Sequence, residues 1–263
     1  GWTWGTIPVD HSIYWQYGAL DTVITTRLFL DHFYDQVKPG TQLSRPYDLE
    51  MANRRICTQM EIRGAKVDLE YSKRKYEELV GYAEQAKSMA FQRYGYNIGS
   101  PSQLARAIEN LGGEITKRTA GGSPSVDKEQ LDMLVIGGNK DVRDIAELVI
   151  NVRKAEKLAS SYFLNFQKDA VNGILHPEIR TLEARTGRMS ITNPALQTLP
   201  SGDPLVRRAF LPRNEGEGIV SSDLDQVEFR LTANFSQDES LIGLFLDADA
   251  TGGDVFTSIM RDV

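Results

Sequence analysis

The sequence has little cysteine and histidine, the residues that disulfide-rich and zinc-binding proteins need. Cys57 is the only cysteine among 263 residues, which excludes an internal disulfide and a cysteine-cluster zinc site. The three histidines, His11, His32 and His176, lie far apart without ligand spacing. These absences exclude a disulfide scaffold and the common zinc modules.

Long apolar runs are also absent. No segment approaches the roughly 18 apolar residues of a membrane-spanning helix, and the first residues lack the basic and apolar regions of a signal peptide. We therefore expect a cytoplasmic protein without a membrane partner. The net charge of −6 argues against a protein that coats nucleic acid indiscriminately. The charge is uneven, however, because residues 174–213 hold six arginines and only three acidic residues.

The periodicity of apolar residues predicts a largely helical chain. Helices are expected over residues 13–37, 47–63, 69–94, 126–135, 141–169 and 237–246, with a further helix starting at Ser100-Pro101. Residues 173–189 alternate apolar and polar side chains and predict a β-hairpin or a pair of strands.

Residues 219–235 read IVSSDLDQVEFRLTANF and predict a short buried strand that turns into a helix. Asp223 stands at the end of this strand, where a rigidly held carboxylate can bind a hard cation. An aspartate before a helix is more often an N-cap, and Asp225 with Glu228 has the spacing of a capping box. The pattern alone favours capping, and we keep that interpretation for Asp225.

The run from Ser221 to Ile242, SSDLDQVEFRLTANFSQDESLI, resembles motif A of the DNA polymerase I family, family A. Two earlier runs, VRKAEKLASSYF and TLEARTGRMSITNPALQTLP, resemble further segments in the family's order. The resemblance implies an α+β fold, a mostly helical thumb followed by a partial palm with an antiparallel sheet. It also implies a C-terminal helix of a 3′-5′ exonuclease-like domain over 1–40, a thumb region over 41–170, and a partial palm through motif A and the start of the fingers over 171–263.

The resemblance implies template-directed addition of deoxynucleotides to a primer 3′ end, with two Mg²⁺ ions. Asp223 matches the aspartate that binds both ions, and the carbonyl of Leu224 would bind one of them. The second carboxylate ligand would lie outside this chain. Gln226 and Glu228 match nucleotide-site residues, Glu228 being the steric gate against a ribose 2′-OH.

Candidate contacts to primer–template DNA come from the same resemblance. Arg188 and Gln197 match residues that probe the minor groove at the primer end, where a hydrogen-bond donor tests pairing without reading sequence. Lys157 matches a lysine near the backbone. Lys117 and Arg118 lie in TKRTAGGSPS, which resembles the thumb tip. The plainer interpretation of Lys157 is a solvated lysine on a helix. The plainer interpretation of the segment with Lys117 and Arg118 is a flexible loop.

Tyr17 and Asp21 lie four residues apart and share a helix face. YGALD resembles the third motif of the family's 3′-5′ exonuclease domain. The other exonuclease carboxylates are absent, so we do not expect nuclease activity.

The sequence departs from the family at Leu224 and Asp225, where tyrosine and serine are usual, and at Phe256, where bacterial enzymes have a histidine. Such divergence favours a phage origin. The family's second metal-binding aspartate and its fingers helix are not found, so we expect the chain to be inactive alone and to need a C-terminal polymerase half. Two alternatives stay open. The chain could be a non-catalytic DNA-binding subunit or a remnant of a split polymerase, or it could be a DEDD-type 3′-5′ exonuclease.

Overall fold

The computed structural model describes residues 3, 5–200 and 204–262. The chain divides into two compact units, Gly1–Glu215 and Gly216–Val263. Helices dominate and the short strands pair antiparallel, which confirms the expected α+β class. The domain boundaries expected after residues 40 and 170 stay a prediction. Among the described residues, none of the helices combines the length and the apolar character needed to cross a membrane.

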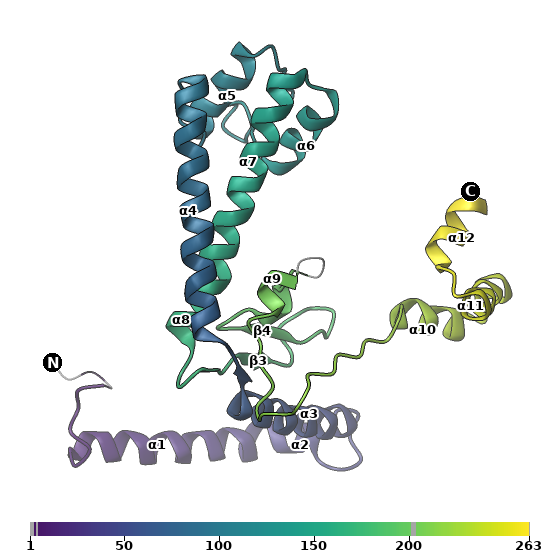
Figure 1. Cartoon of the computed structure of the whole chain (residues 1–263). Coiled ribbons are helices and arrows are strands. Elements are labelled where there is room, and N and C mark those ends of the chain that lie inside the picture. The colour runs from purple at the N-terminus through teal and green to yellow at the C-terminus, as the bar shows by residue number, and fades with distance from the viewer. Residues whose placement is uncertain (1–2, 4, 201–203, 263) are drawn as a thin grey trace. The chain divides into compact units, whose positions relative to one another are not determined.

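The first unit holds the larger set of elements (Figure 1). Its helices are α1 (Ser12–Leu28), α2 (Tyr34–Val37), α3 (Ser44–Arg63), α4 (Leu69–Tyr94), α5 (Pro101–Asn110), α6 (Lys128–Gly137), α7 (Lys140–Leu158), α8 (Asn165–Asp169) and α9 (Pro204–Arg207). The π-helical turns η1 (Phe29–Phe33) and η2 (Ala159–Leu164) and the 3-10 turn η3 (Leu196–Thr198) join them. The strands are β1 (Ala65–Lys66), β2 (Ile174–Leu175), β3 (Glu178–Arg180) and β4 (Ser190–Thr192). These bounds confirm the helices expected from periodicity.

Helices α4 and α7 lie side by side, with α5 and α6 at their far end (Figure 1). The buried face of α4 is made of small residues, among them Ala83, Ala86 and Ala90. The buried face of α7 carries branched residues at helical spacing, including Val142 and Ile145. All of them belong to one hydrophobic cluster, in which alanines on one helix make room for branched side chains on the other.

A second hydrophobic cluster lies where η2 and α8 meet the strands and α9, with Phe163, Phe166 and Leu175 buried. Residues 173–189 are expected to form a β-hairpin or a pair of strands: two strands, β2 and β3, are present, but a hairpin between them is wrong. Strand β2 pairs with β1, from before α4, and β3 pairs with β4, from beyond residue 189. The residue before a proline is held extended, so the His176-Pro177 step carries the chain onward from β2 to β3 without a tight reversal.

Gly64 ends α3 with a left-handed φ of 64°. A Cβ at this position would lie 2.6 Å from Ile174 Cγ2 and 3.0 Å from His176 Nδ1, and closer still to the carbonyl of Leu175. Only glycine therefore fits where the end of α3 approaches β2.

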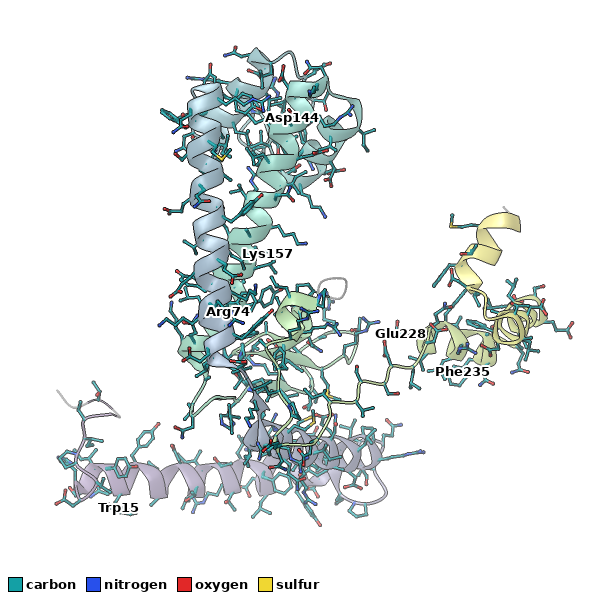
Figure 2. The ribbon with its side chains drawn as sticks, viewed as in Figure 1. Trp15, Arg74, Asp144, Lys157, Glu228 and Phe235 are labelled. Carbon is teal, nitrogen blue, oxygen red and sulfur yellow. The ribbon has the colours of Figure 1, made fainter. Side chains whose placement is uncertain are left out.

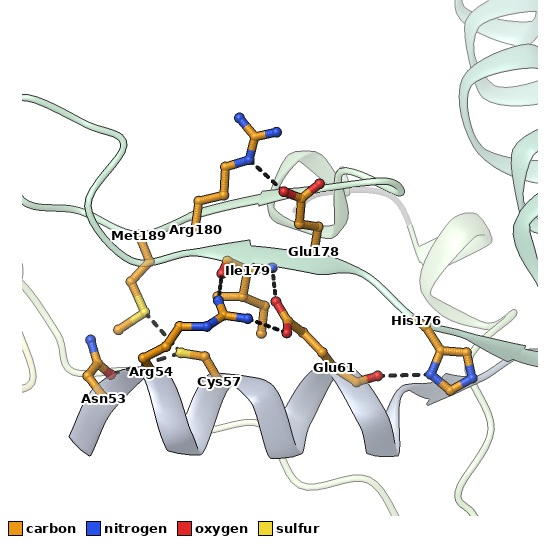
Figure 3. Close-up of polar contacts among 9 residues, drawn as sticks. All are labelled: Asn53, Arg54, Cys57, Glu61, His176, Glu178, Ile179, Arg180 and Met189. Carbon is orange, nitrogen blue, oxygen red and sulfur yellow. Dashed lines mark hydrogen bonds and ion pairs between the residues drawn. The ribbon is translucent and has the colours of Figure 1, made fainter. Parts of the chain in front are cut away.

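A polar network joins α3 to β3 (Figure 3). The Glu61 carboxylate accepts a hydrogen bond from the Ile179 amide at 2.6 Å and pairs with Arg54 at 2.5 Å. Arg54 also donates to the Ile179 carbonyl. Both backbone groups of Ile179 that face α3 are thus satisfied by a pair of opposite charges, which fixes the position of β3 on the helix.

The second unit contains α10 (Val227–Ser236), α11 (Glu239–Thr251) and α12 (Val255–Asp262). Phe229 is central to its small core, stacked on Phe256 at a centroid distance of 5.6 Å and edge-on to Phe245 at 5.4 Å. Aromatic side chains thus hold α10, α11 and α12 together.

Two expectations for the start of this unit are wrong. Residues 219–222 form no strand and Val220 is 92% exposed, because the described residues give this extended segment no strand to pair with. Asp225 is not the N-cap of α10. Gln226 occupies that position with a left-handed φ of 49°, and no side chain caps the helix.

We expect Glu61→Gln to lower the free energy of unfolding of the first unit. The substitution removes the charged acceptor of the Ile179 amide and the partner of Arg54, and a hydrogen bond to a charged group contributes roughly 1.5–3 kcal/mol. Urea unfolding of residues 1–263, followed by circular dichroism, measures the change.

The matched control is Glu78→Gln on α4, where the carboxylate is 51% exposed and pairs with Lys75. An exposed pair contributes about 1 kcal/mol or less, so its effect should be smaller. Equal effects of the two substitutions would mean that the network does not fix β3.

Candidate nucleic-acid interface

The turn before α10 exposes the Asp223 carboxylate. Asp223 Oδ1 accepts a hydrogen bond from the Leu224 amide at 3.0 Å, and Leu224 itself is exposed. In the described part of the chain Asp223 belongs to no ion pair, and no three His, Cys, Asp or Glu side chains gather closely enough to hold a metal ion. The turn thus offers one carboxylate and a neighbouring backbone carbonyl, both hard oxygen ligands.

Gln226 links this turn to the start of α12. Its side-chain amide donates to Asp254 Oδ1 at 3.0 Å, and the other oxygen of Asp254 accepts from the hydroxyl and amide of Thr257. The Thr257 hydrogen bonds, with a smaller contribution from Gln226, lower the pKa of Asp254. Glu228 comes two residues after Gln226 and is exposed in the first turn of α10 (Figure 2).

Arg230 holds the turn from its other side. Its guanidinium donates to the Asp225 carbonyl at 3.1 Å and to both carboxylate oxygens of Asp249 at 2.9 and 2.6 Å, and it lies 4.8 Å over the ring of Phe245. The bond from Arg230 lowers the pKa of Asp249 below its ordinary 3.8. Because the pKa of Asp249 is lowered in the folded chain, its ion pair with Arg230 stabilises the fold fully at pH values above the ordinary pKa. This stabilisation is lost as the pH falls through the lowered pKa.

Arg188 and Gln197 line one groove of about 830 Å³ between α3 and the β3–β4 pair. The Gln197 side chain accepts from the Ile191 amide and donates to the Met189 carbonyl, each at 3.0 Å. Gln197 therefore fastens β4 to the turn η3, a role that sequence reasoning missed because its partners are backbone groups with no residue signature. Arg180, near this groove, pairs with Glu178 at 2.9 Å.

Lys157 lies in the last turn of α7 (Figure 2), exposed, beside a second groove of about 590 Å³. Ser161 and Asn165 follow it at intervals of four residues along η2 and α8, and Pro194 and Leu196 line the opposite wall. The helical wall of the groove therefore combines polar side chains, Lys157 among them, with Tyr162 and Phe166.

Lys117 and Arg118 lie in a hairpin closed by backbone hydrogen bonds. The Ser125 amide donates to the Lys117 carbonyl at 2.9 Å, and Arg118 pairs with Pro124 in an antiparallel bridge. Lys117 Nζ lies 2.7 Å from Asp127 and also bonds Glu129, and these contacts raise its pKa.

Tyr17 and Asp21 are both exposed on α1, a helix without a buried residue. The structure thus brings the sequence-predicted residues together in small groups: Asp223 with Leu224, Gln226 and Glu228; Arg188 with Gln197; Lys117 with Arg118; and Tyr17 with Asp21. The structure also shows four carboxylates that the sequence did not point to, because each contacts a residue of a separate segment. Asp249 binds Arg230, Asp254 binds Gln226, and Asp127 and Glu129 bind Lys117.

The fold is that of a polymerase domain. The POL domain of Pol1 from M. smegmatis, solved in complex with DNA primer-template and dNTP, aligns with 78% of this chain and 36% of its own, with a TM-score of 0.64 and 28% identity. The family model for DNA polymerase family A matches residues 69–263. The chain belongs to DNA polymerase family A.

Curated relatives agree with this membership. The DNA polymerase of Mycobacterium phage L5 is 32% identical over 245 residues, 92% of this chain and 40% of the phage protein. DNA polymerase I of Bacillus subtilis (strain 168) is 30% identical over 236 residues, 87% of this chain and 26% of its own. The chain therefore spans 40% or less of the length of these relatives.

We expect Arg230→Lys to loosen the turn that carries Asp223. An ammonium group cannot reproduce two parallel bonds to Asp249 together with the bond to the Asp225 carbonyl. Amide hydrogen exchange should therefore accelerate over residues 226–230 and along α11. Arg106→Lys, an exposed arginine on α5, serves as the matched control, and equal protection in both variants would contradict the role given to Arg230.

Proposed function

We propose that this chain is the thumb and partial palm of a DNA-directed DNA polymerase that adds deoxynucleotides to a primer 3′ end. The observation that carries the proposal is the match to family A over residues 69–263, together with the exposed Asp223 turn within it. The proposed division is an exonuclease-like helix over 1–40, the thumb over 41–170 and the partial palm over 171–263. The proposed location is the cytoplasm of a bacterium or of a phage-infected cell.

The residues of the turn fit Mg²⁺ in type, because a carboxylate and a backbone carbonyl are oxygen ligands. Asp223 would hold both ions and the Leu224 carbonyl one of them. When bound, the ions would lower the pKa of the primer hydroxyl and neutralise phosphate charge. The exposure of Asp223, with one of its oxygens held by the Leu224 amide, supports this assignment.

The other residues of the chain would bind and orient the substrates. Glu228, exposed in the first turn of α10, would exclude a ribose 2′-OH, and Gln226 would fix the turn on which the incoming nucleotide rests. Arg188 would donate to the minor groove of the primer end, with Gln197 setting the wall of the same groove. Lys157 would lie along the DNA backbone.

Of Tyr17 and Asp21 only Asp21 carries a carboxylate, and the described residues contain no group of three or more His, Cys, Asp or Glu side chains that could hold a metal ion. A non-catalytic DNA-binding subunit is the rival, and it differs from the proposal in giving Asp223 and the nucleotide-site residues of the same turn no catalytic role.

We expect Asp223→Asn, in a polymerase reconstituted with this chain, to slow primer extension by at least about a hundredfold. Metal ions supply several kcal/mol of transition-state stabilisation, and each 1.36 kcal/mol is about tenfold in rate. Binding of primer–template should be retained, because it depends on the other contacts.

The matched control is Asp247→Asn, an exposed carboxylate on α11, which should extend primers at the wild-type rate. Near wild-type extension by Asp223→Asn would refute the proposed metal ligand.

We also expect residues 1–263 to extend primers only when a C-terminal family A fragment supplies the remaining polymerase segments. The chain spans 40% or less of its relatives, and phosphoryl transfer needs several groups assembled around the phosphates. Mg²⁺-dependent extension is measured with and without the fragment. Extension by an Asp223→Asn preparation purified in parallel measures the activity of any contaminating host polymerase.

Extension by the wild-type chain alone, with none from the parallel preparation, would contradict this expectation. DNA binding without extension in every mixture would favour the non-catalytic subunit.

A further inference from the structure

The tip hairpin, residues 116–125, is a surface of fixed backbone at the α5–α6 end of the first unit. The Thr119 amide donates to the Ser123 carbonyl at 2.8 Å, and the Ser125 amide to the Lys117 carbonyl at 2.9 Å. These two backbone bonds close the hairpin, so the residues at its end project together.

Gln130 ties the hairpin to α6. This side chain is 2% exposed, and its carbonyl oxygen accepts from the Lys117 amide at 2.9 Å and from the Thr116 hydroxyl at 3.2 Å. A buried amide that satisfies a backbone group fixes that group in place. The backbone on which Lys117 and Arg118 stand is therefore set by α6.

The two cations of the hairpin have different surroundings. Lys117 Nζ lies 2.7 Å from Asp127 and also bonds Glu129. Arg118 is exposed and forms no ion pair within the described part of the chain. Adjacent residues thus present one neutralised cation and one that faces solvent.

A cation contributes to binding of a nucleic acid by displacing counterions from phosphate. Lys117 would first have to leave two carboxylates, whereas Arg118 would not. We propose that Asp127 and Glu129 mask Lys117, and that Arg118 with the hairpin backbone makes the phosphate contact of the tip. The inference rests on the proposed function, because the ligand is the backbone of primer–template DNA.

The test is the dissociation constant of residues 1–263 for a primer–template duplex, measured over a range of KCl concentrations. Arg118→Gln should make the slope of log affinity against log salt shallower by about 0.9, the value of one phosphate contact. Lys117→Gln should leave the slope unchanged. Equal losses of slope in the two variants would overturn the masking.

Glu129→Gln should partly unmask Lys117 and tighten binding by about two- to fivefold at low salt, the order expected of one added contact. Glu129 is chosen because the Asp127 carboxylate also caps α6, accepting from the Gln130 amide at 3.0 Å. The gain should vanish in Lys117→Gln/Glu129→Gln, because the contact needs the lysine.

The control for general charge is Asp132→Asn, which removes one negative charge from the same helix. A gain equal to that of Glu129→Gln, or one that persists without Lys117, would also overturn the masking.

A second readout needs no DNA. The rate at which acetic anhydride modifies the Lys117 amine, measured by mass spectrometry, should rise in Glu129→Gln because less of the amine is held protonated. An unchanged rate would overturn the masking while DNA binding persists. Absence of DNA binding in every variant would instead overturn the Arg118 contact and the proposed function. The acetylation rate of the Lys117 amine would then be the only test of whether Asp127 and Glu129 mask this residue.

Discussion

The packing of α4 against α7 is the constraint on which the first unit depends. Alanines on α4 let branched residues of α7 approach closely, and Leu104, Ile108 and Leu131 from α5 and α6 complete the same core. Burying each such side chain contributes about 1.5–3 kcal/mol, so the helices cannot slide without losing several contacts at once. One end of the pair carries the tip hairpin, and the other leads through η2 to the groove beside Lys157.

Charge is the second constraint, because under the proposed function a chain with net charge −6 would bind a polyanion. Lys117 is paired with Asp127 and Glu129, and Arg180 with Glu178, whereas Arg118 forms no ion pair in the described part of the chain. A single exposed pair contributes about 0–1 kcal/mol, but Lys117 is held by two carboxylates and would have to leave both to reach a phosphate. Arg118 would not have to leave any carboxylate, and a phosphate contact from it would be sensitive to salt.

The helices were predictable from the sequence because their signals are local. The apolar period of α7, the Asp68 cap of α4 and Gly64 after α3 each act within a few residues. The pairing of β2 with β1 was not, because its partner lies more than a hundred residues earlier. The candidate site divides in the same way: the motif located Asp223, but the partners of Lys117 and Gln197 became evident only in the folded chain.

The extra charge at Asp225 is tolerated beside Arg230, although it adds little stability. The carboxylate of Asp225 lies 3.8 Å from the guanidinium and is 77% exposed, so this ion pair contributes little. The bond that positions the turn is the one from Arg230 to the Asp225 carbonyl, which any residue at 225 supplies. Serine and aspartate are therefore interchangeable for the backbone of the turn. Because the backbone and the Asp249 pair hold this conformation, the Asp223 side chain is left exposed, as the proposed metal ligand requires.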